Sequence, residues 1–183
     1  AMDEDDKSGL TIAGLQLDAL QLGSSSEEFE TGSRDEVVVV AQRLAEQAQR
    51  LLLLHTEALS PEIYDRAGFL DAVRRLANRH SHTRFLVLVQ ESRQAVQRGH
   101  RLIELARQLS STIEFRRPAP EYRHYHESFL LADTTGYLHR RIPARYEGSA
   151  SFNAPGKAAD LEKYFMEVWE RSEPDLELKR LYL

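Results

Sequence analysis

The 183-residue sequence contains no cysteine. It can therefore form neither a disulfide nor a thiolate metal site, a composition typical of the reducing cytoplasm, where we expect the protein to be located. No apolar run approaches the roughly 18 residues that a membrane-spanning helix needs. The first residues also lack the charged opening and the small-residue cleavage site of a secretory signal. We expect a soluble protein with no membrane span.

Several motifs of common enzyme classes are also missing. The nine glycines are scattered, so no glycine-rich loop is present to hold a phosphate. Ser149 and Ser151 are not framed by the Gly-x-Ser-x-Gly motif of serine hydrolases. His124 and His126 would share one face of a strand, but no cysteine or suitably spaced carboxylate completes a zinc site. We therefore expect no metal and no cofactor.

Charge is distributed unevenly along the chain. Residues 1–36 hold ten Asp and Glu against Lys7 and Arg34, whereas residues 84–145 hold eleven arginines and no lysine. The arginine-rich segment would attract an anion, although arginines on helix faces are usually solvated charges. Tyrosines in the same segment would suit stacking on a nucleic acid strand. An overall pI near 5.8 and the acidic start argue against nucleic acid as the partner.

We predict one domain preceded by an acidic leader. The chain length and its 42% hydrophobic residues suffice to bury one sizeable core but not two. Residues 1–30 are acidic around an apolar patch from Leu10 to Leu22, so we expect a flexible leader whose patch docks as a strand or lies along the surface. Residues 31–183 are expected to form the single α/β domain.

Apolar periodicities alternate between helix and strand from Ser33 onward. Ser33 followed by Glu36 is a capping-box signature, and the apolar spacing after it predicts the first helix of the domain. Short apolar runs predict buried strands at 51–54, 85–89 and 112–116, with helical stripes between them. This alternation predicts an α/β fold with a central, mostly parallel or mixed sheet covered by helices on both faces.

The last third of the domain has a different pattern. Residues 129–139 indicate two strands joined by an Asp-Thr-Thr-Gly turn, in which Gly136 supplies the positive φ. Pro155 begins a final helix whose apolar face includes Trp169. We expect Trp169 to lie in the core rather than in a ligand site.

One motif in the arginine-rich region carries the strongest functional signal. His126 and Asp133 have the spacing of the motif His-x-Lys-x-x-x-x-Asp, with Ser128 at the lysine position. Further along, Gly148-Ser-Ala-Ser-Phe-Asn153 is similar to a Gly-Ser-x-Asn element. Together with the α/β order, these motifs resemble half of a phospholipase D-like phosphodiesterase whose catalytic motif is degenerate.

The resemblance implies a mechanism in which the histidine attacks phosphorus and the lysine ammonium stabilises charge on the phosphoryl oxygens. Loss of one such contact commonly costs about 10²- to 10³-fold in rate. The family also uses two copies of the motif, and this chain has one. Catalysis would therefore require a homodimer and a substitute cation such as Arg123, Arg140 or Arg141.

Two functional hypotheses follow from this resemblance. The main one is a noncatalytic binding or interaction module whose degenerate pocket holds a phosphate-bearing ligand or a protein partner, because binding demands less than transition-state stabilisation. The alternative is a residual phosphodiesterase or nuclease that acts as a homodimer through His126 and Asp133. The residues expected to line the pocket are His55, His126, Ser128, Asp133, Ser151 and Asn153.

A second resemblance rests on Arg98-Gly-His-Arg-Leu-Ile-Glu-Leu-Ala, on Arg116-Arg-Pro-Ala-Pro-Glu-Tyr, and on Phe165 with Trp169-Glu-Arg-Ser-Glu-Pro. These stretches are similar to an uncharacterised proteobacterial domain found alone or appended to acetyltransferase-type proteins. The likeness implies an accessory domain that docks on such an enzyme through the acidic leader or the arginine-rich segment.

Overall fold

The computed structural model describes residues 9–179. In chain order the elements are β1 (Thr11–Ile12), β2 (Leu15–Gln16), η1 (Leu17–Ala19), β3 (Phe29–Thr31), α1 (Arg34–Gln47), β4 (Leu51–Thr56), α2 (Pro61–Tyr64), α3 (Ala67–Ala77), β5 (Arg84–Val89), α4 (Arg93–Gln97), α5 (Arg101–Gln108), β6 (Ile113–Arg117), η2 (Pro120–Tyr122), β7 (Ser128–Ala132), β8 (Gly136–Arg140), β9 (Gly148–Ser151), α6 (Pro155–Glu170), β10 (Glu173–Pro174) and α7 (Leu176–Lys179).

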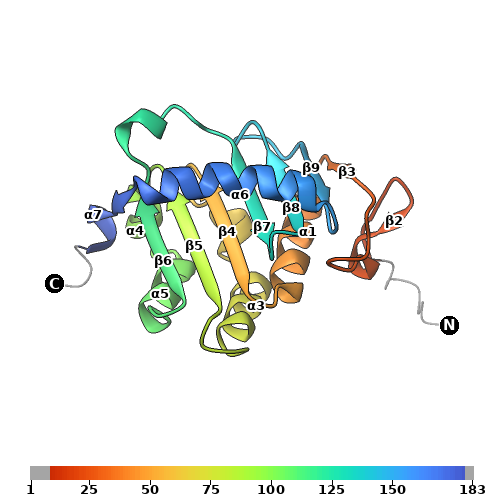
Figure 1. Ribbon diagram of the computed structural model, residues 1–183, viewed down its shortest axis with the longest axis horizontal. Helices are drawn as coiled ribbons and strands as arrows, with labels where there is room; N and C mark the ends of the chain where they lie inside the picture. The colour runs from red at the N-terminus through yellow and green to blue at the C-terminus, as the bar shows by residue number, and fades with distance from the viewer. Residues whose placement is uncertain (1–8, 180–183) are drawn as a thin grey trace.

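An eight-stranded sheet forms the centre of the domain, with the strand order β10-β6-β5-β4-β7-β8-β9-β3 (Figure 1). Strand β5 pairs in parallel with both β4 and β6. The other neighbours in the sheet, from β7 to β3 and at β10, are antiparallel. The predicted α/β class with a mixed sheet is confirmed, and its parallel part is limited to the three strands that helices connect.

Helices cover both faces of the sheet. Figure 1 shows α6 crossing one face, while α1, α3 and α5 lie behind the strands on the other. The larger apolar core lies under α1 to α5, and a smaller one holds Phe165 and Trp169 of α6 against the strands. The prediction that Trp169 is a core residue is confirmed, since 8% of its surface is exposed and Arg116 stacks on its ring. In the described part of the chain, none of the helices is long and apolar enough to cross a membrane.

Local sequence signals account for the helix boundaries. At the start of α1, Ser33 Oγ accepts a hydrogen bond from Glu36 N at 3.2 Å, and Glu36 Oε1 accepts one from Ser33 N at 3.0 Å. This reciprocal capping box satisfies two backbone groups that the first turn would otherwise leave unpaired. Between α4 and α5 the chain turns at Gly99, whose φ is +68°, a value that glycine adopts without steric cost. A single predicted helical stripe therefore becomes two helices.

The predicted hairpin forms, but its turn differs from the expected one. Asp133 and Thr134, both with φ of +54°, make the left-handed turn between β7 and β8. Gly136 instead begins β8, and a Cβ there would lie 2.6 Å from Leu22 Cδ1 and 2.8 Å from Leu44 Cδ2. The glycine is thus needed for close packing rather than for turn geometry, because core atoms already fill the space.

The segment before α1 packs against the domain. Leu17 and Leu20 are buried in the larger core, and Gln47 of α1 accepts a hydrogen bond from Leu22 N and donates one to Leu20 O. Strand β3 pairs with β9 and forms one edge of the main sheet. The apolar patch predicted in the leader therefore contacts the core, and the predicted boundary at residue 30 falls inside β3. The acidic run before residue 9 lies outside the described residues.

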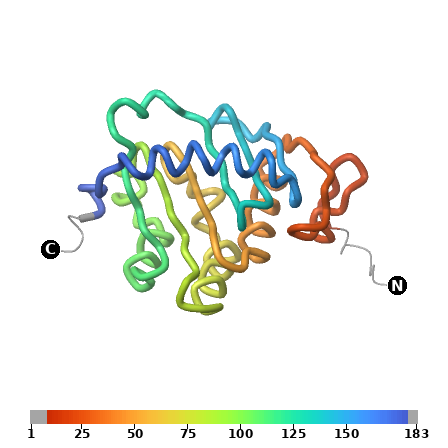
Figure 2. Tube along the Cα trace, viewed as in Figure 1, coloured from red at the N-terminus to blue at the C-terminus, as the bar shows by residue number. Residues whose placement is uncertain are grey.

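A long connection between β6 and β7 arches over one end of the sheet (Figure 2). It contains η2 and is fixed by Gln90, whose Nε2 donates to Tyr122 O at 3.1 Å and to Tyr125 O at 3.2 Å. Gln90 directly follows the last residue of the parallel strand β5. The arch therefore delivers the first motif residues, His126 and Ser128, to the carboxyl-terminal end of β4.

Candidate functional site

The register of the sheet places a row of side chains across five neighbouring strands. His55 of β4 pairs with Phe129 of β7, Phe129 with His139 of β8, His139 with Ser149 of β9, and Ser149 with Glu30 of β3. Directly paired residues in antiparallel strands point to the same face of a sheet. The row therefore runs on one face from the centre of the sheet to its edge.

His55 occupies the inner end of this row. It is fully buried, its ring stacks on Phe129 with centroids 5.4 Å apart, and Tyr125 meets its edge. Its Nδ1 lies 2.9 Å from Glu127 O, which fixes Nδ1 as the protonated nitrogen because a carbonyl only accepts. Burial away from water lowers the pKa of His55 to about 4. His55 is thus a neutral packing residue, and it does not line the cavity at the outer end of the row.

His126, which stands at the nucleophile position of the motif, lies in the connection just before β7. Its side chain is 59% exposed, and Nδ1 is 3.5 Å from Glu57 Oε1. Glu57 directly follows β4, so this contact ties the end of the arch to the end of that strand. His126 therefore meets a surface carboxylate rather than the other motif side chains.

Ser128, at the lysine position, is buried, in contrast to the exposed His126. Its side chain is 2% exposed, beneath Tyr64 of α2 and beside Arg140, its partner in the β7–β8 ladder. Burial raises the pKa of Tyr64, while Arg140 and Ser128 act in the opposite direction. Arg140 is itself 1% exposed, and its Nη1 donates to Pro143 O at 3.3 Å and Arg145 O at 3.0 Å. A cation does lie beside Ser128, but it is enclosed by protein.

Asp133 lies at the other end of β7. Its Oδ1 accepts from Arg50 N and Leu51 N at 3.0 Å each, and its Oδ2 accepts from Gln49 N at 2.8 Å. The carboxylate therefore satisfies three backbone N–H groups where the chain leaves α1 and begins β4. This is a structural contact, remote along the strand from Ser128.

Ser151 and Asn153 also lie toward the Asp133 end of the sheet. Ser151 pairs with Tyr137 and is fully buried, and its Oγ accepts a hydrogen bond from Asn153 N at 3.2 Å. Asn153 Nδ2 donates to Ser26 Oγ at 2.9 Å. Ser151 and Asn153, which carry the resemblance to Gly-Ser-x-Asn, therefore lie at the other end of the sheet from the start of β7.

The structure does not bring the six predicted residues into one pocket. Ser128 and His55 lie near the end of β4, on opposite faces of the sheet, because successive strand positions alternate. Asp133, Ser151 and Asn153 lie toward the opposite end of β7. Apart from His55, these residues are close together in the chain, but the five-residue strand β7 separates His126 from Asp133.

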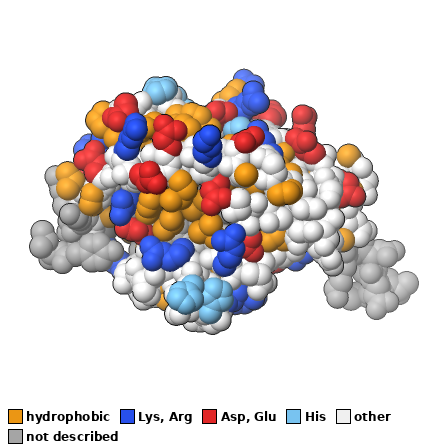
Figure 3. Space-filling view, viewed as in Figure 1, with side chains coloured by type: hydrophobic (Ala, Val, Ile, Leu, Met, Phe, Trp, Pro, Cys, Tyr) orange, Lys and Arg blue, Asp and Glu red, His pale blue; other side chains and the backbone are white. Residues whose placement is uncertain are grey.

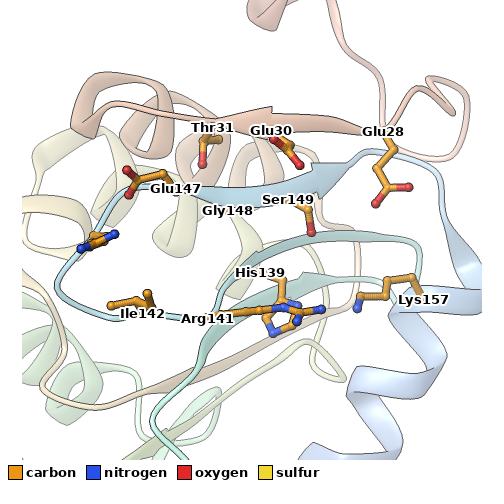
Figure 4. A pocket seen from close by; sticks show the side chains of 11 residues that line it. Glu28, Glu30, Thr31, His139, Arg141, Ile142, Glu147, Gly148, Ser149 and Lys157 are labelled. Atoms are coloured by element: carbon orange, nitrogen blue, oxygen red, sulfur yellow. The ribbon is translucent and has the colours of Figure 1, made fainter.

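A cavity of about 520 Å³ opens instead at the outer end of the row, over β8, β9 and β3. His139 and Ser149 form its floor, and Glu30, the partner of Ser149 on β3, lies across the cavity from His139 (Figure 4). The other lining residues are Glu28, Thr31, Arg141, Ile142, Arg145, Glu147, Gly148 and Lys157. Figure 4 shows Arg141 extending alongside His139 toward Lys157, with Glu28 and Glu30 on the opposite wall.

His139 is linked to the motif strand through Glu127. Its Nε2 lies 3.1 Å from Glu127 Oε1, and 7% of the His139 side chain is exposed. Burial lowers the pKa of His139, the Glu127 carboxylate raises it, and Lys157 and Arg141 lower it. Both cations line the same cavity as the imidazole.

Sequence reasoning missed Glu127, His139 and Lys157, although Arg141 was named as a possible substitute cation. Glu127 is an unspecified position of the motif, and Lys157 comes from the first turn of α6. The hairpin register did contain a usable signal: once the turn is centred on Thr134, His139 must pair with Phe129. Within residues 9–179, no group of three His, Cys, Asp or Glu side chains is arranged to hold a metal ion.

Comparisons of the whole structure support the fold. The archaeal chromatin protein TrmBL2 is similar with a TM-score of 0.59 at 15% identity over 81% of this chain, which spans 54% of that protein. The phospholipase D family member Nuc from Salmonella typhimurium has a TM-score of 0.53 at 12% identity, covering 80% of this chain and 97% of Nuc. Phosphatidylserine synthase from Haemophilus influenzae Rd KW20 has a TM-score of 0.57 at 14% identity, covering 84% of this chain and 41% of the synthase.

These likenesses establish a phospholipase D-like fold, since identities this low carry information about architecture alone. No curated protein matches the chain in sequence. A sequence family does match, and its match extends over residues 33–181, from the cap of α1 to the last helix. The chain therefore belongs to the family described as a domain of unknown function, DUF7931.

Proposed function

We propose that this chain is a noncatalytic binding module on a phospholipase D-like scaffold. The observation that carries the proposal is that the three motif side chains make separate contacts in three different places. His126 meets Glu57 at the surface, Ser128 is enclosed beside Arg140, and Asp133 holds three backbone N–H groups. The three side chains therefore do not converge on a common point.

The chemistry explains why this arrangement opposes catalysis. Phosphodiester cleavage by this route needs a nucleophilic imidazole and a cation that converge on one phosphorus. Arg140 is the cation nearest to Ser128 along the strand ladder, yet it is 1% exposed and donates to two carbonyls of its own loop. A substrate phosphate would have to displace Tyr64 and these carbonyls to reach it, so the energetic cost of binding the transition state rises.

A binding role for a phosphate-bearing ligand is supported by the cavity at the end of the row. Arg141, Arg145 and Lys157 line it, and within residues 9–179 these three side chains form no ion pair with a carboxylate. Cations that are free of partners and gathered in a concave site attract anionic ligands more strongly than scattered surface charges do. The proposed ligand site is therefore displaced from the motif residues.

Nucleic acid is the less favoured ligand. TrmBL2 is described as an archaeal chromatin protein with a novel mode of DNA binding. On the face of the present chain that α6 crosses, however, Lys and Arg side chains alternate with Asp and Glu and form no continuous basic stripe (Figure 3). A strand of nucleic acid requires such a stripe because phosphate contacts dominate its affinity. Docking on an acetyltransferase-type enzyme stays a prediction from the sequence.

Hydrolysis assays test the noncatalytic proposal. We expect the full chain to release no p-nitrophenol from bis(p-nitrophenyl) phosphate, and to leave single-stranded DNA intact, in buffer that contains EDTA. The His126→Ala variant should give the same trace as the unaltered chain, and a phosphodiesterase that cleaves both substrates without a divalent cation serves as the positive control. Cleavage by the unaltered chain that His126→Ala abolishes would reject the proposal and favour a homodimeric phosphodiesterase.

A further inference from the structure

We propose that the cavity over β8, β9 and β3 binds a zwitterionic phosphate ester, with phosphate on one wall and an ammonium group on the other. This assignment rests on the proposed binding role and adds the site and the ligand class. It follows from the arrangement of charge in the cavity, which separates cationic from carboxylate side chains across a shared floor.

The floor of the cavity is rigid because it belongs to the sheet. His139, Ser149 and Glu30 sit directly opposite one another on three hydrogen-bonded strands. The Glu127 carboxylate contacts His139 Nε2 from the β7 side of the cavity and fixes the imidazole in place. A site built on paired strands positions its polar groups more accurately than a site built on loops.

The cationic wall comes from two elements that meet at the floor. Arg141 follows the last residue of β8, and Lys157 is the third residue of α6. Figure 4 shows both on the same side of the cavity as His139, and both lower the pKa of His139. A phosphate located here would gain charge-assisted hydrogen bonds from two side chains.

The opposite wall is acidic, and this excludes a simple anion as the best ligand. Glu28, Glu30 and Glu147 line it, and Glu28 Oε1 also accepts a hydrogen bond from Tyr137 OH at 2.9 Å. Ionised carboxylates accept hydrogen bonds but cannot donate them. An inorganic phosphate would satisfy the cations and be repelled by these groups. A ligand that also carries an ammonium group satisfies both walls.

The volume of about 520 Å³ accommodates such a ligand with room for a substituent on the phosphate. O-phosphoethanolamine is a small molecule that carries both charges. The phosphoethanolamine group occurs in free phosphate monoesters and in lipid headgroups, so one chemistry has two possible sources. Both present a phosphate and an ammonium joined by a short linker.

Isothermal titration calorimetry with O-phosphoethanolamine tests the proposal. We expect saturable binding of this compound to the full chain, with inorganic phosphate and ethanolamine each binding at least tenfold more weakly. A parallel sedimentation assay compares vesicles of phosphatidylcholine, whose quaternary ammonium has no N–H group to donate to the carboxylate wall, with vesicles that also contain phosphatidylethanolamine. Binding in calorimetry assigns a soluble ligand, whereas binding only to the phosphatidylethanolamine vesicles assigns a lipid headgroup.

Matched variants locate the binding event. Arg141→Gln and Glu30→Gln should each weaken O-phosphoethanolamine, or the vesicles if they are the ligand, by about tenfold, as expected for loss of one charge-assisted contact. Arg74→Gln, an exposed arginine of α3 paired with Asp71, should leave the affinity unchanged. Equal binding of inorganic phosphate and O-phosphoethanolamine would overturn the zwitterionic assignment. Absence of binding in both assays would overturn the inference, while the hydrolysis assays would still decide the noncatalytic proposal.

Discussion

Glu127 Oε1 lies 3.1 Å from His139 Nε2, which joins the residue before β7 to the floor of the cavity on β8. The backbone oxygen of the same glutamate lies 2.9 Å from His55 Nδ1. A residue between the two motif positions His126 and Ser128 thus contacts both histidines of the cross-strand row. Glu127 therefore makes polar contacts with β4 and β8, the strands on either side of β7.

The Glu127 carboxylate should set the titration of His139. Removing its charge with Glu127→Gln eliminates an interaction that raises the pKa of His139, so the pKa should fall further below its ordinary value. The imidazole Cε1–H resonance, followed by NMR against pH, measures this directly. Glu147→Gln, a carboxylate that lines the cavity without contributing to the His139 shift, is the control. An unchanged or higher His139 pKa in Glu127→Gln would contradict the assignment.

His55 should make the protein less stable in acid. Its pKa of about 4 in the folded state lies below the value of about 6.5 expected for the unfolded chain, so the unfolded chain binds more protons between these values. The free energy of unfolding should therefore fall as the pH drops from about 6.5 to 4, by an amount on the order of 3 kcal/mol. Urea denaturation at half-unit pH steps provides the measurement.

A substitution separates His55 from the other buried histidines. His100 and His139 also have lowered pKa values and add to the acid sensitivity in the same direction. His55→Gln keeps a donor for Glu127 O and removes the titrating group, so its stability curve should be visibly flatter between pH 4 and 6.5. A slope equal to that of the unaltered chain would show that His55 does not titrate as the structure indicates.

Asp133 should matter for stability, although the sequence pattern assigns it to a catalytic motif. Asp133→Ala leaves three backbone N–H groups at the start of β4 without their carboxylate, at a cost of roughly 2–4 kcal/mol. Asp133→Asn keeps one acceptor oxygen and tolerates the positive φ, so it should lose about half as much. Thermal and urea unfolding measure both variants. A fully stable Asp133→Ala would argue against the structural role.

The sequence was informative where a local rule decides the structure. The Ser33–Glu36 capping box, the apolar strands and Pro155 at the start of α6 each depend on residues close together in the chain, and each formed as predicted. Strand β9 and the edge strand β3 were not predicted, because strands of four and three residues are too short to show a recognisable alternation of apolar and polar side chains. Their pairing depends on tertiary contacts.

The candidate site was hidden for the same reason. Glu30, Ser149 and His139 are far apart in sequence and become neighbours only through strand register. Motif spacing pointed to His126 and Asp133, which the extended strand β7 holds apart. A spacing pattern records which residues a family uses, whereas the side-chain directions on a sheet decide which of them meet.

The turn between β7 and β8 offers a last test of the structure. Thr134 has a φ of +54°, a conformation that costs a β-branched residue about 1–2 kcal/mol and that asparagine adopts more readily. Thr134→Asn should therefore raise the free energy of unfolding by about 1 kcal/mol. Thr135→Asn is the matched control, because Thr135 is outside the left-handed region and its Oγ1 donates to Asp133 O, so that change should give no gain. Urea denaturation measures both variants. A destabilised Thr134→Asn would mean that the hairpin turns at another residue. The pairing of Phe129 with His139, on which the row of side chains depends, would then shift as well.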